Sequence, residues 1–332
     1  MNQEHPAENN TDPHITPVWF KLIESTAIPP GSDVNYISIG LDSYLPTLRL
    51  PSRKNELLGL STFYSPLFGA INQSNASRDE LEKIFKEIRN DSLSTTTINF
   101  SPLDPEDKFF STLKSALKSS GWITDSYFCF GNWYEILDNS EYKDYFSNRP
   151  SRLRNTITRG KKKLAKDPSF SISLHTEQND ELDGAISDFI AVYNLSWKKP
   201  EPFPAFIPEL CRLAAKRGWL RLGILRLDSI PVAAQIWLIS NQTAYIVKLA
   251  YRQDYSKRSV GSVLTAYLME HAIDIDKVKC IDYLIGDDTY KREWTPLRRE
   301  RHGIVAFNLR TTKGFIAALR HFTGKSLKKL IK

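Results

Sequence analysis

The chain has 332 residues, of which 41% are apolar and 25% are charged, and this composition excludes a protein that is disordered over its whole length. Its 45 Lys and Arg residues against 38 Asp and Glu residues give a formal net charge of +7 at pH 7, which favours anionic partners such as phosphate-bearing cofactors, nucleic acid or acidic lipid. The length predicts about two domains.

Three cysteines, Cys129, Cys211 and Cys280, lie far apart in the sequence and show no metal-ligand spacing. We therefore expect a reducing compartment and no zinc or other metal site. The sequence contains no run of about 18 apolar residues, and its N-terminus lacks the apolar segment of a secretion signal. These features predict a cytoplasmic protein without a transmembrane segment.

The first half of the chain alternates apolar and amphipathic stretches. Residues 1–17 are polar and rich in Pro and Asn, and they are predicted to form a disordered tail. The predicted elements that follow are strands at 36–41, 44–50, 58–68, 95–100 and 127–137, and helices at 78–89 and 107–119. Strands that alternate with helices predict a mixed α/β (α+β) fold rather than a helical bundle. We assign residues 18–148 to an N-terminal lobe.

A basic segment comes next. Residues 149–166 hold eight Lys and Arg residues in 18 positions, with Leu153, Ile157 and Leu164 at near-helical spacing. We predict a basic helix over residues 149–168 at the junction of two lobes. Such a charge run is often only a solvated helix face. Alternatively, the helix presents an electropositive wall to a phosphate-bearing donor or an acidic acceptor.

The second half repeats the rhythm of helices and strands. The predicted elements are helices at 185–197 and 209–218, strands at 219–227, 232–240 and 243–251, a helix after Lys257, a strand at 280–287, a short helix at 290–294 and a strand at 303–310. Tight turns join the first three strands, which should be antiparallel, whereas the strand at 280 follows a helix and should be parallel to its predecessor. We assign 169–315 to a C-terminal domain and 316–332 to a basic tail.

The stretch SKRSVGS at 256–262 lies between a strand and a helix. Apolar residues recur at i, i+3, i+4 and i+7 from Val260, so the first helical turn should lie at 258–262. Unpaired amides and a partial positive charge at a helix N-terminus suit anionic oxygen, and a glycine lets a ligand approach the backbone. An ordinary N-cap serine and a packing glycine would give the same pattern. The candidate pyrophosphate-binding residues are Lys257, Arg258, Ser259, Val260, Gly261 and Ser262.

The sequence YRQDYSKRSVGSVLTAYLMEHAI, followed by CIDYLIGDDTYKREW, resembles the GNAT acyltransferase superfamily, specifically its Fem/CelD-like two-lobed branch. In that superfamily a Q/R-x-x-G-x-G/A loop holds the pyrophosphate of acyl-coenzyme A. Arg258 and Gly261 match its first and fourth positions, and Ser262, one position early, stands in for the second small residue. The signature D-x-G-x-x-x-x-Y-K-x-x-W of the branch matches Asp282 to Trp294, with the glycine displaced. The resemblance covers about residues 125–310. It implies two GNAT-like lobes with mixed, mostly antiparallel sheets flanked by helices, and a GNAT domain as the C-terminal lobe.

The same resemblance implies where the chemistry takes place. The pantetheine arm of the donor would lie between two splayed strands and bond backbone groups of Leu249, Ala250 and Tyr251. Tyr290 would protonate the leaving thiolate. Asp287 or Asp288 would take the ammonium proton or hold the acceptor, unless one of them only caps the short helix.

Polar residues within apolar strands are candidates for acceptor binding. If residues 241–242 form a two-residue hairpin turn, Gln235 and Lys248 are cross-strand partners on one face. Lys248 could instead extend to a sheet edge. Lys291 and Trp197 are further candidates, with a surface cation and a core side chain as the respective alternatives.

These features predict an N-acyltransferase that depends on acyl-coenzyme A, with acetyl-coenzyme A as the expected co-substrate. The acceptor would be an amine, such as an amino sugar or a polysaccharide or cell-envelope precursor, and not nucleic acid. A Fem-like transferase with aminoacyl-tRNA as donor is an alternative, although the long helical hairpin of many such enzymes is not evident. A third possibility is a non-catalytic protein that binds nucleic acid or lipid through the basic junction and tail.

Overall fold

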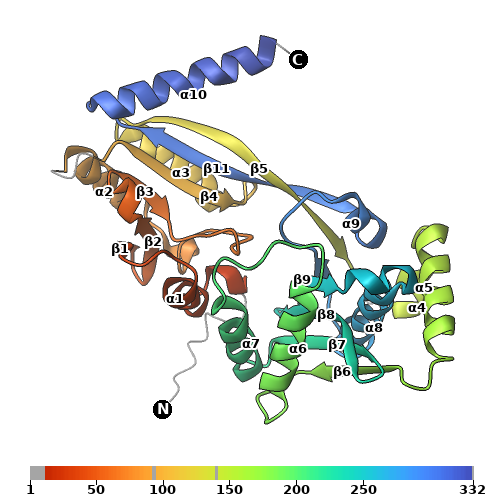
Figure 1. Cartoon of the computed structure of the whole chain (residues 1–332). Helices are drawn as coiled ribbons and strands as arrows, with labels where there is room; N and C mark the ends of the chain where they lie inside the picture. Colours follow the sequence, from red (N-terminus) through yellow and green to blue (C-terminus); the bar gives the residue numbers. More distant parts are fainter. Residues whose placement is uncertain (1–11, 92–94, 139–140, 331–332) are drawn as a thin grey trace. The chain divides into compact units, whose positions relative to one another are not determined.

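The structure is a computed structural model that describes residues 12–91, 95–138 and 141–330 (Figure 1). It has two compact units: unit 1 comprises the chain up to Phe130 together with the chain from Glu300 onward, and unit 2 comprises Gly131–Arg299. Both boundaries fall inside strands, β5 (Ile123–Ile136) and β11 (Leu297–Phe307). The division therefore differs from the predicted junction at 149–168, because the chain passes between the units within strands and not through a linker.

Unit 1 contains a mixed sheet together with several helices. Its remaining elements are a 3₁₀ helix at Pro13–Ile15, α1 (Pro17–Thr26), β1 (Asp33–Gly40), β2 (Ser43–Arg49), β3 (Glu56–Gly59), α2 (Arg78–Asn90), β4 (Thr97–Leu103), α3 (Lys108–Ser119) and α10 (Thr312–Leu330). The strand order is β1-β2-β3-β4-β11-β5, and the β3/β4 pair is parallel whereas β1/β2, β2/β3 and β4/β11 are antiparallel.

Three predictions for unit 1 need correction. Residues 12–17 are ordered, because Asp12 caps the 3₁₀ helix and the Thr16 hydroxyl accepts a hydrogen bond from the Trp19 amide, whereas residues 1–11 lie outside the described residues. The predicted strand at 58–68 forms only its first two residues, as the end of β3. The predicted basic tail is part of α10.

Unit 2 has a mixed sheet covered by helices on both faces. Its elements besides β5 and β11 are α4 (Tyr142–Ser147), α5 (Ser151–Leu164), β6 (Ser171–His175), α6 (Leu182–Asn194), α7 (Phe206–Lys216), β7 (Leu220–Leu227), β8 (Ile230–Ser240), β9 (Thr243–Tyr251), α8 (Val260–Asp274), β10 (Cys280–Asp282) and α9 (Thr289–Trp294). The order is β5-β10-β9-β8-β7-β6, with β10/β9 parallel and the other pairs antiparallel. The mixed fold class and the predicted strand directions are confirmed.

A β-bulge changes the register of the β8–β9 hairpin. The turn lies at Asn241 and Gln242, as predicted, with both residues at positive φ. A register shift between Ile236 and Trp237 then pairs Lys248 with Ile236 and pairs Gln235 with Leu249. Because side chains alternate between the faces of a strand, one extra residue places Gln235 and Lys248 on opposite faces. The predicted cross-strand pairing of these two residues is therefore wrong.

Helix α8 packs on β7, β8 and β9, and α5 packs on α8. Val260, Val263 and Leu264 of α8 are fully buried, as the helical spacing predicts. A Cβ atom on Gly160 of α5 would lie 2.8 Å from Val263 Cγ2, so glycine allows the two helices to approach closely. The basic helix α5 thus belongs to unit 2 and fixes the position of α8.

Strands β9 and β10 separate after three pairs. On the β9 side, β10 pairs only with residues 243–245, whereas β9 continues to Tyr251. At the end of β10, the buried Asp282 carboxylate accepts hydrogen bonds from Asn132 Nδ2 and the Leu284 amide, each at 2.6 Å, and pairs with the Arg299 guanidinium. Leu284 has a positive φ of 53°, which turns the chain out of the sheet. This network holds the two strands apart.

We predict that Arg299→Met destabilises the protein by about 3 kcal/mol, because it leaves the buried Asp282 carboxylate without its cationic partner. Arg298→Met is the matched control, since it removes a more exposed pair with Asp287 and should change the free energy of unfolding by less than about 1 kcal/mol. Chemical denaturation measures both. Equal losses in the two variants would contradict the role of the Asp282 network.

Candidate active site

A cavity of about 390 Å³ lies in unit 2, beside the part of β9 that extends beyond β10. Eight of the predicted site residues line it: Trp197, Gln235, Leu249, Ala250, Tyr251, Gly261, Ser262 and Tyr290. The others are Arg152, Leu153, Thr156, Thr265, Glu293 and Trp294. Strand β9 and helices α5, α8 and α9 therefore meet at one cavity.

The wall formed by β9 is an open strand edge. Beyond Tyr245, in the described part of the chain, β9 has a strand neighbour in β8 but none on the side of β10. Backbone groups on such an edge can bond an extended ligand as a further strand would. Residues 249–251 lie in this stretch and line the cavity.

The N-terminus of α8 forms a second wall. The first helical hydrogen bond runs from the Val263 amide to the Ser259 carbonyl at 3.0 Å. Within the residues that the structure describes, the amides of Val260, Gly261 and Ser262 donate no hydrogen bond to a protein acceptor. The Ser259 side chain makes no cap bond, and its amide bonds the Ser256 carbonyl. Three amides and the positive end of the helix are thus available to an anion.

Gly261 has a packing role as well. A Cβ atom at this position would lie 2.7 Å from Cδ1 of Tyr251, whose ring packs 4.6 Å from the Trp197 ring. Any larger residue would push Tyr251 out of its place. Glycine therefore keeps both the amide terminus and the aromatic wall of the cavity in position.

The cations near this terminus differ from those predicted. The Arg258 guanidinium bonds the Asp167 carboxylate at 2.8 Å, and hydrogen bonds from Ser169 and Arg258 lower the pKa of Asp167. Lys257 is exposed and does not line the cavity. Arg152 of α5 does line it. The cation at the cavity wall therefore comes from the basic helix and not from the loop.

Tyr290 reaches the cavity from α9. Its ring packs edge-on against Tyr283 at 6.2 Å, and 42% of the residue is exposed. Burial, with a smaller contribution from Asp288, raises the pKa of the Tyr290 phenol above its usual value of 10.0. The phenol is therefore protonated at neutral pH and can donate a proton to a strongly basic leaving group.

The three carboxylates near Tyr290 differ in their partners. Asp287 is held by Arg298 through bonds of 3.0 and 2.7 Å, and these bonds lower its pKa, which argues against Asp287 as a base. Asp288 is the N-cap residue of α9 but its side chain makes no cap bond, and its Oδ2 lies 3.5 Å from Lys291 Nζ. Glu293, which was not predicted, lines the cavity one helical turn after Tyr290.

Lys291 is occupied by the main chain. Its buried ammonium donates to the carbonyls of Ile285 at 2.5 Å and of Tyr283 and Gly286 at 3.3 Å each. Burial lowers its pKa. This arrangement argues against the predicted role in substrate binding, because the ammonium fixes the segment that follows β10.

Gln235 and Lys248 also have protein partners. The Gln235 amide donates to the Gly261 carbonyl at 3.2 Å and to Thr265 Oγ1 at 2.8 Å, and it accepts from Trp237 Nε1 at 2.9 Å. Gln235 therefore ties the start of α8 to β8, although it lines the cavity. On the opposite face, Lys248 pairs with Glu201 at 2.6 Å. A role in substrate binding stays a prediction for Gln235 and Trp197, and the geometry does not favour one for Lys248.

Lys198 lies in this region and was not among the residues that the sequence analysis selected. Its ammonium lies 5.8 Å from the ring centroids of Tyr193 and Trp197. Burial, together with repulsion from Lys248 and Lys291, lowers its pKa from 10.5 to about 8. Only the fold brings these three lysines together, so no local pattern could have indicated the shift.

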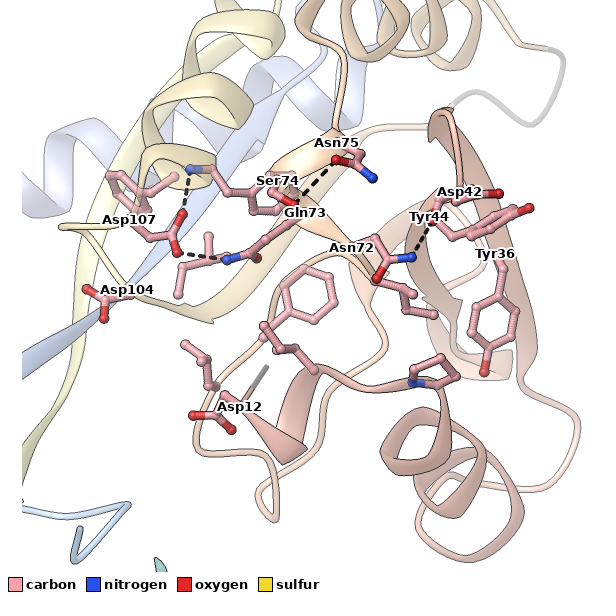
Figure 2. A pocket seen from close by; sticks show the side chains of 18 of the residues that line it. Asp12, Tyr36, Asp42, Tyr44, Asn72, Gln73, Ser74, Asn75, Asp104 and Asp107 are labelled. Carbon is pink, nitrogen blue, oxygen red and sulfur yellow. Dashed lines mark hydrogen bonds between the residues drawn. The ribbon is translucent and has the colours of Figure 1, made fainter. Parts of the chain in front are cut away.

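A larger cavity, of about 990 Å³, lies in unit 1 (Figure 2). Its acidic side chains are largely bonded within the protein. Asp12 bonds the His14 imidazole, Asp104 pairs with Arg301, and Asp107 accepts a hydrogen bond from Gln73 at 2.7 Å. We assign no chemistry to it, because these carboxylates serve the fold.

Comparisons with known proteins bear on the family of one domain and on the fold. Residues 151–292 match the family model described as an acetyltransferase (GNAT) domain. The sequence matches no curated protein. Within the described residues, no group of His, Cys, Asp and Glu side chains is arranged to hold a metal ion, and no helix combines the length and apolar character that crossing a membrane requires.

Solved structures are similar over almost the whole chain. FemX gives a TM-score of 0.61 at 10% identity, covering 92% of this chain and 94% of that chain. The C-terminal domain assigned to a lysylphosphatidylglycerol synthetase from Agrobacterium fabrum gives 0.53 at 12% identity, covering 87% of each chain. A tandem GNAT protein from the clavulanic acid biosynthesis pathway gives 0.50 at 12% identity, covering 90% of this chain and 91% of that chain. These likenesses show the fold.

We predict that Lys198→Met stabilises the protein at pH 7 by about 1–2 kcal/mol, because the folded state holds this cation at a lowered pKa. Between pH 8 and 10.5 the unfolded chain binds more protons at Lys198 than the folded protein does, so the penalty is complete below pH 8 and fades as the pH rises. The advantage of the variant should therefore shrink by pH 10. Denaturation at both pH values measures it, with the exposed Lys199→Met as control. An advantage that is the same at both pH values would contradict the lowered pKa.

Proposed function

We propose, on the premise that this chain belongs to the GNAT superfamily through its domain at residues 151–292, that it transfers an acyl group from acyl-coenzyme A to an amine. One observation carries the proposal: the open edge of β9, the free amides of α8 and the Tyr290 phenol all border one cavity. Both the donor and the acceptor named here go beyond what the family match states.

The cavity offers suitable partners for each part of the donor. Amides of 260–262 would bond the pyrophosphate, with Arg152 as a nearby cation. Residues 249–251 would bond the amide groups of the pantetheine arm along the strand edge. The thioester would then lie toward α9, which holds Tyr290. Acetyl-coenzyme A is the proposed donor, and the cytoplasm, where such donors are made, is the proposed location.

The proposed reaction has a balanced set of proton transfers. The acceptor nitrogen attacks the thioester carbonyl carbon, so a C–N bond forms and the C–S bond breaks. Tyr290 gives its phenolic proton to the departing thiolate, and a carboxylate takes the ammonium proton, so that solvent restores both groups. Glu293 is the proposed base because it lines the cavity, and Asp288 is the second candidate. Asp287 is not proposed, since Arg298 occupies it.

The acceptor is proposed to be an amine that also carries an anionic group, such as an amino sugar derivative or a cell-envelope precursor. Lys198 supports this choice, because burial and repulsion from Lys248 and Lys291 disfavour its positive charge more than Glu201 and Asp288 favour it. A carboxylate or phosphate on the acceptor would relieve that repulsion.

A second candidate donor is aminoacyl-tRNA. FemX and the domain assigned to a lysylphosphatidylglycerol synthetase have a similar fold over almost the whole chain. Exposed cations of α5 beyond the cavity, among them Arg159, Lys162 and Lys163, could contact a nucleic-acid backbone. Acyl-coenzyme A remains the first proposed donor, because it could bind within the cavity without contacting the exposed cations of α5.

The donor is tested by calorimetric titration with coenzyme A, acetyl-coenzyme A and longer acyl thioesters, and with aminoacyl-tRNA. We expect acetyl-coenzyme A to bind. At 100 times its Kd it should raise the free energy of unfolding by about 2.7 kcal/mol, which denaturation with and without the ligand measures. Gly261→Ala should weaken that binding at least tenfold, because the added Cβ displaces Tyr251. Gly184→Ala is the control, since a Cβ there meets nothing within 4 Å. Binding of aminoacyl-tRNA alone would favour the second donor, and binding of neither would overturn the proposal.

Tyr290→Phe should lower kcat by about 100-fold and leave the KM for the donor within a factor of about three, because it removes a proton donor and keeps the ring. Tyr267→Phe, on α8 and outside the cavity lining, is the matched control. Steady-state kinetics with the best amine acceptor measures both. Unchanged kcat in Tyr290→Phe would remove this residue from the proposed mechanism.

A further inference from the structure

Helix α10 of unit 1 presents an apolar stripe to solvent. Phe315, Ile316, Leu319 and Phe322 are exposed by 53%, 42%, 55% and 37%. They recur at i, i+1, i+4 and i+7, which places them on one side of the helix. Monomeric proteins rarely leave several large apolar side chains contiguous in water, so such a stripe marks a surface that contacts a partner.

The opposite side of α10 is attached to unit 1, beside β5 and β11 (Figure 1). Ala318 is buried, and the His321 imidazole bonds the Asp125 carboxylate of β5 at 2.8 Å. At the start of the helix, a Cβ atom on Gly314 would lie 2.2 Å from the Asn308 carbonyl oxygen, so glycine is needed for this close approach. The stripe is therefore displayed by a helix that is already formed and anchored.

The charged side chains of α10 near the stripe are cations. Residues 312–326 contain three Lys and Arg residues, Lys313, Arg320 and Lys325, and no Asp or Glu. Lys313 and Arg320 of α10 are exposed, and neither has an acidic partner among the described residues. Lys325, in contrast, pairs with Asp125 at 2.6 Å. An apolar stripe bordered by unpaired cations is typical of a helix that lies in the interface of an anionic bilayer.

The charge pattern decides among the partners. A second copy of this helix would place cations against cations without an acid to offset them. Nucleic acid would match the cations but would leave the Phe and Leu side chains in water. An anionic bilayer matches both features, because acyl chains receive the apolar side chains and headgroup phosphates face the cations.

We propose that α10 docks this protein on the surface of a bilayer that contains anionic phospholipid. The apolar side chains of Phe315, Ile316 and Leu319 enter the acyl-chain boundary, and Lys313 and Arg320 contact phosphates. Binding requires no free energy to form the helix, because α10 is already folded and packed on unit 1. This role is independent of the donor that unit 2 uses.

The test is co-sedimentation of the full-length protein with vesicles of phosphatidylcholine that contain 30% phosphatidylglycerol or none. We expect binding to the anionic vesicles, a loss of binding as salt rises, and little binding to the neutral vesicles. The double variant F315S/L319S should bind at least tenfold more weakly. Leu41→Ser is the matched control, because Leu41 is an apolar residue of unit 1 that is 82% exposed and lies outside α10.

Charge variants separate the two contributions. Lys313→Gln and Arg320→Gln should each weaken binding about fivefold, the factor that corresponds to about 1 kcal/mol per cation. Circular dichroism confirms that every variant keeps its fold. Equal binding to neutral and anionic vesicles, or no binding to either, overturns the proposal. A dimer in sedimentation velocity that F315S/L319S abolishes, or tRNA binding that it leaves intact without any vesicle binding, would also overturn it.

Discussion

The early separation of β9 and β10 is the constraint on which the candidate site depends. Parallel strands that have begun to pair gain hydrogen bonds by continuing, so the separation needs groups that hold it open. Asp282 supplies acceptors for the turn that leaves the sheet, and Arg299 compensates its buried charge. Lys291 then binds three carbonyls of the departing segment. The signature residues Asp282 and Lys291 are thus structural, and their effect is to leave the edge of β9 unpaired.

The same logic explains why the start of α8 stays available to a ligand. A helix N-terminus normally acquires a side-chain cap, but Ser259 adopts a left-handed conformation and provides none. Gln235 of β8 instead fixes this terminus, because its amide donates hydrogen bonds to the Gly261 carbonyl and to Thr265. The Trp237 indole donates a hydrogen bond to the Gln235 side chain and so fixes its orientation. The N-terminus of α8 is therefore held in place, although within the described residues its first three amides have no protein acceptor. A site that is rigid before binding loses less entropy when the ligand arrives.

The sequence predicted most elements of unit 2, because apolar periodicity and short turns determine helices and strands locally, but the strand predicted at 280–287 ends at Asp282 and α4 was not predicted. It could not predict the bulge between Ile236 and Trp237, since neither strand carries a glycine or other local signal for an extra residue, and that bulge placed Gln235 and Lys248 on opposite faces. The partners of Lys291 are main-chain carbonyls, which no side-chain pattern reveals. Glu293 stood within a recognised motif, but only the direction of α9 shows that it borders the cavity.

The position of the cations bears on the identity of the donor. Of the eight Lys and Arg residues between 149 and 166, Arg152 borders the cavity, and Arg149 is buried in a pair with Glu135. Lys161 pairs with Glu270 on α8. In the proposed donor site, Arg152 and the three amides would face a pyrophosphate, whereas a nucleic-acid donor would have to engage the remaining exposed cations of α5. Because those cations lie outside the cavity, the proposed small phosphorylated donor would not contact them, whereas binding of a larger nucleic-acid donor through them would weaken steeply as salt rises.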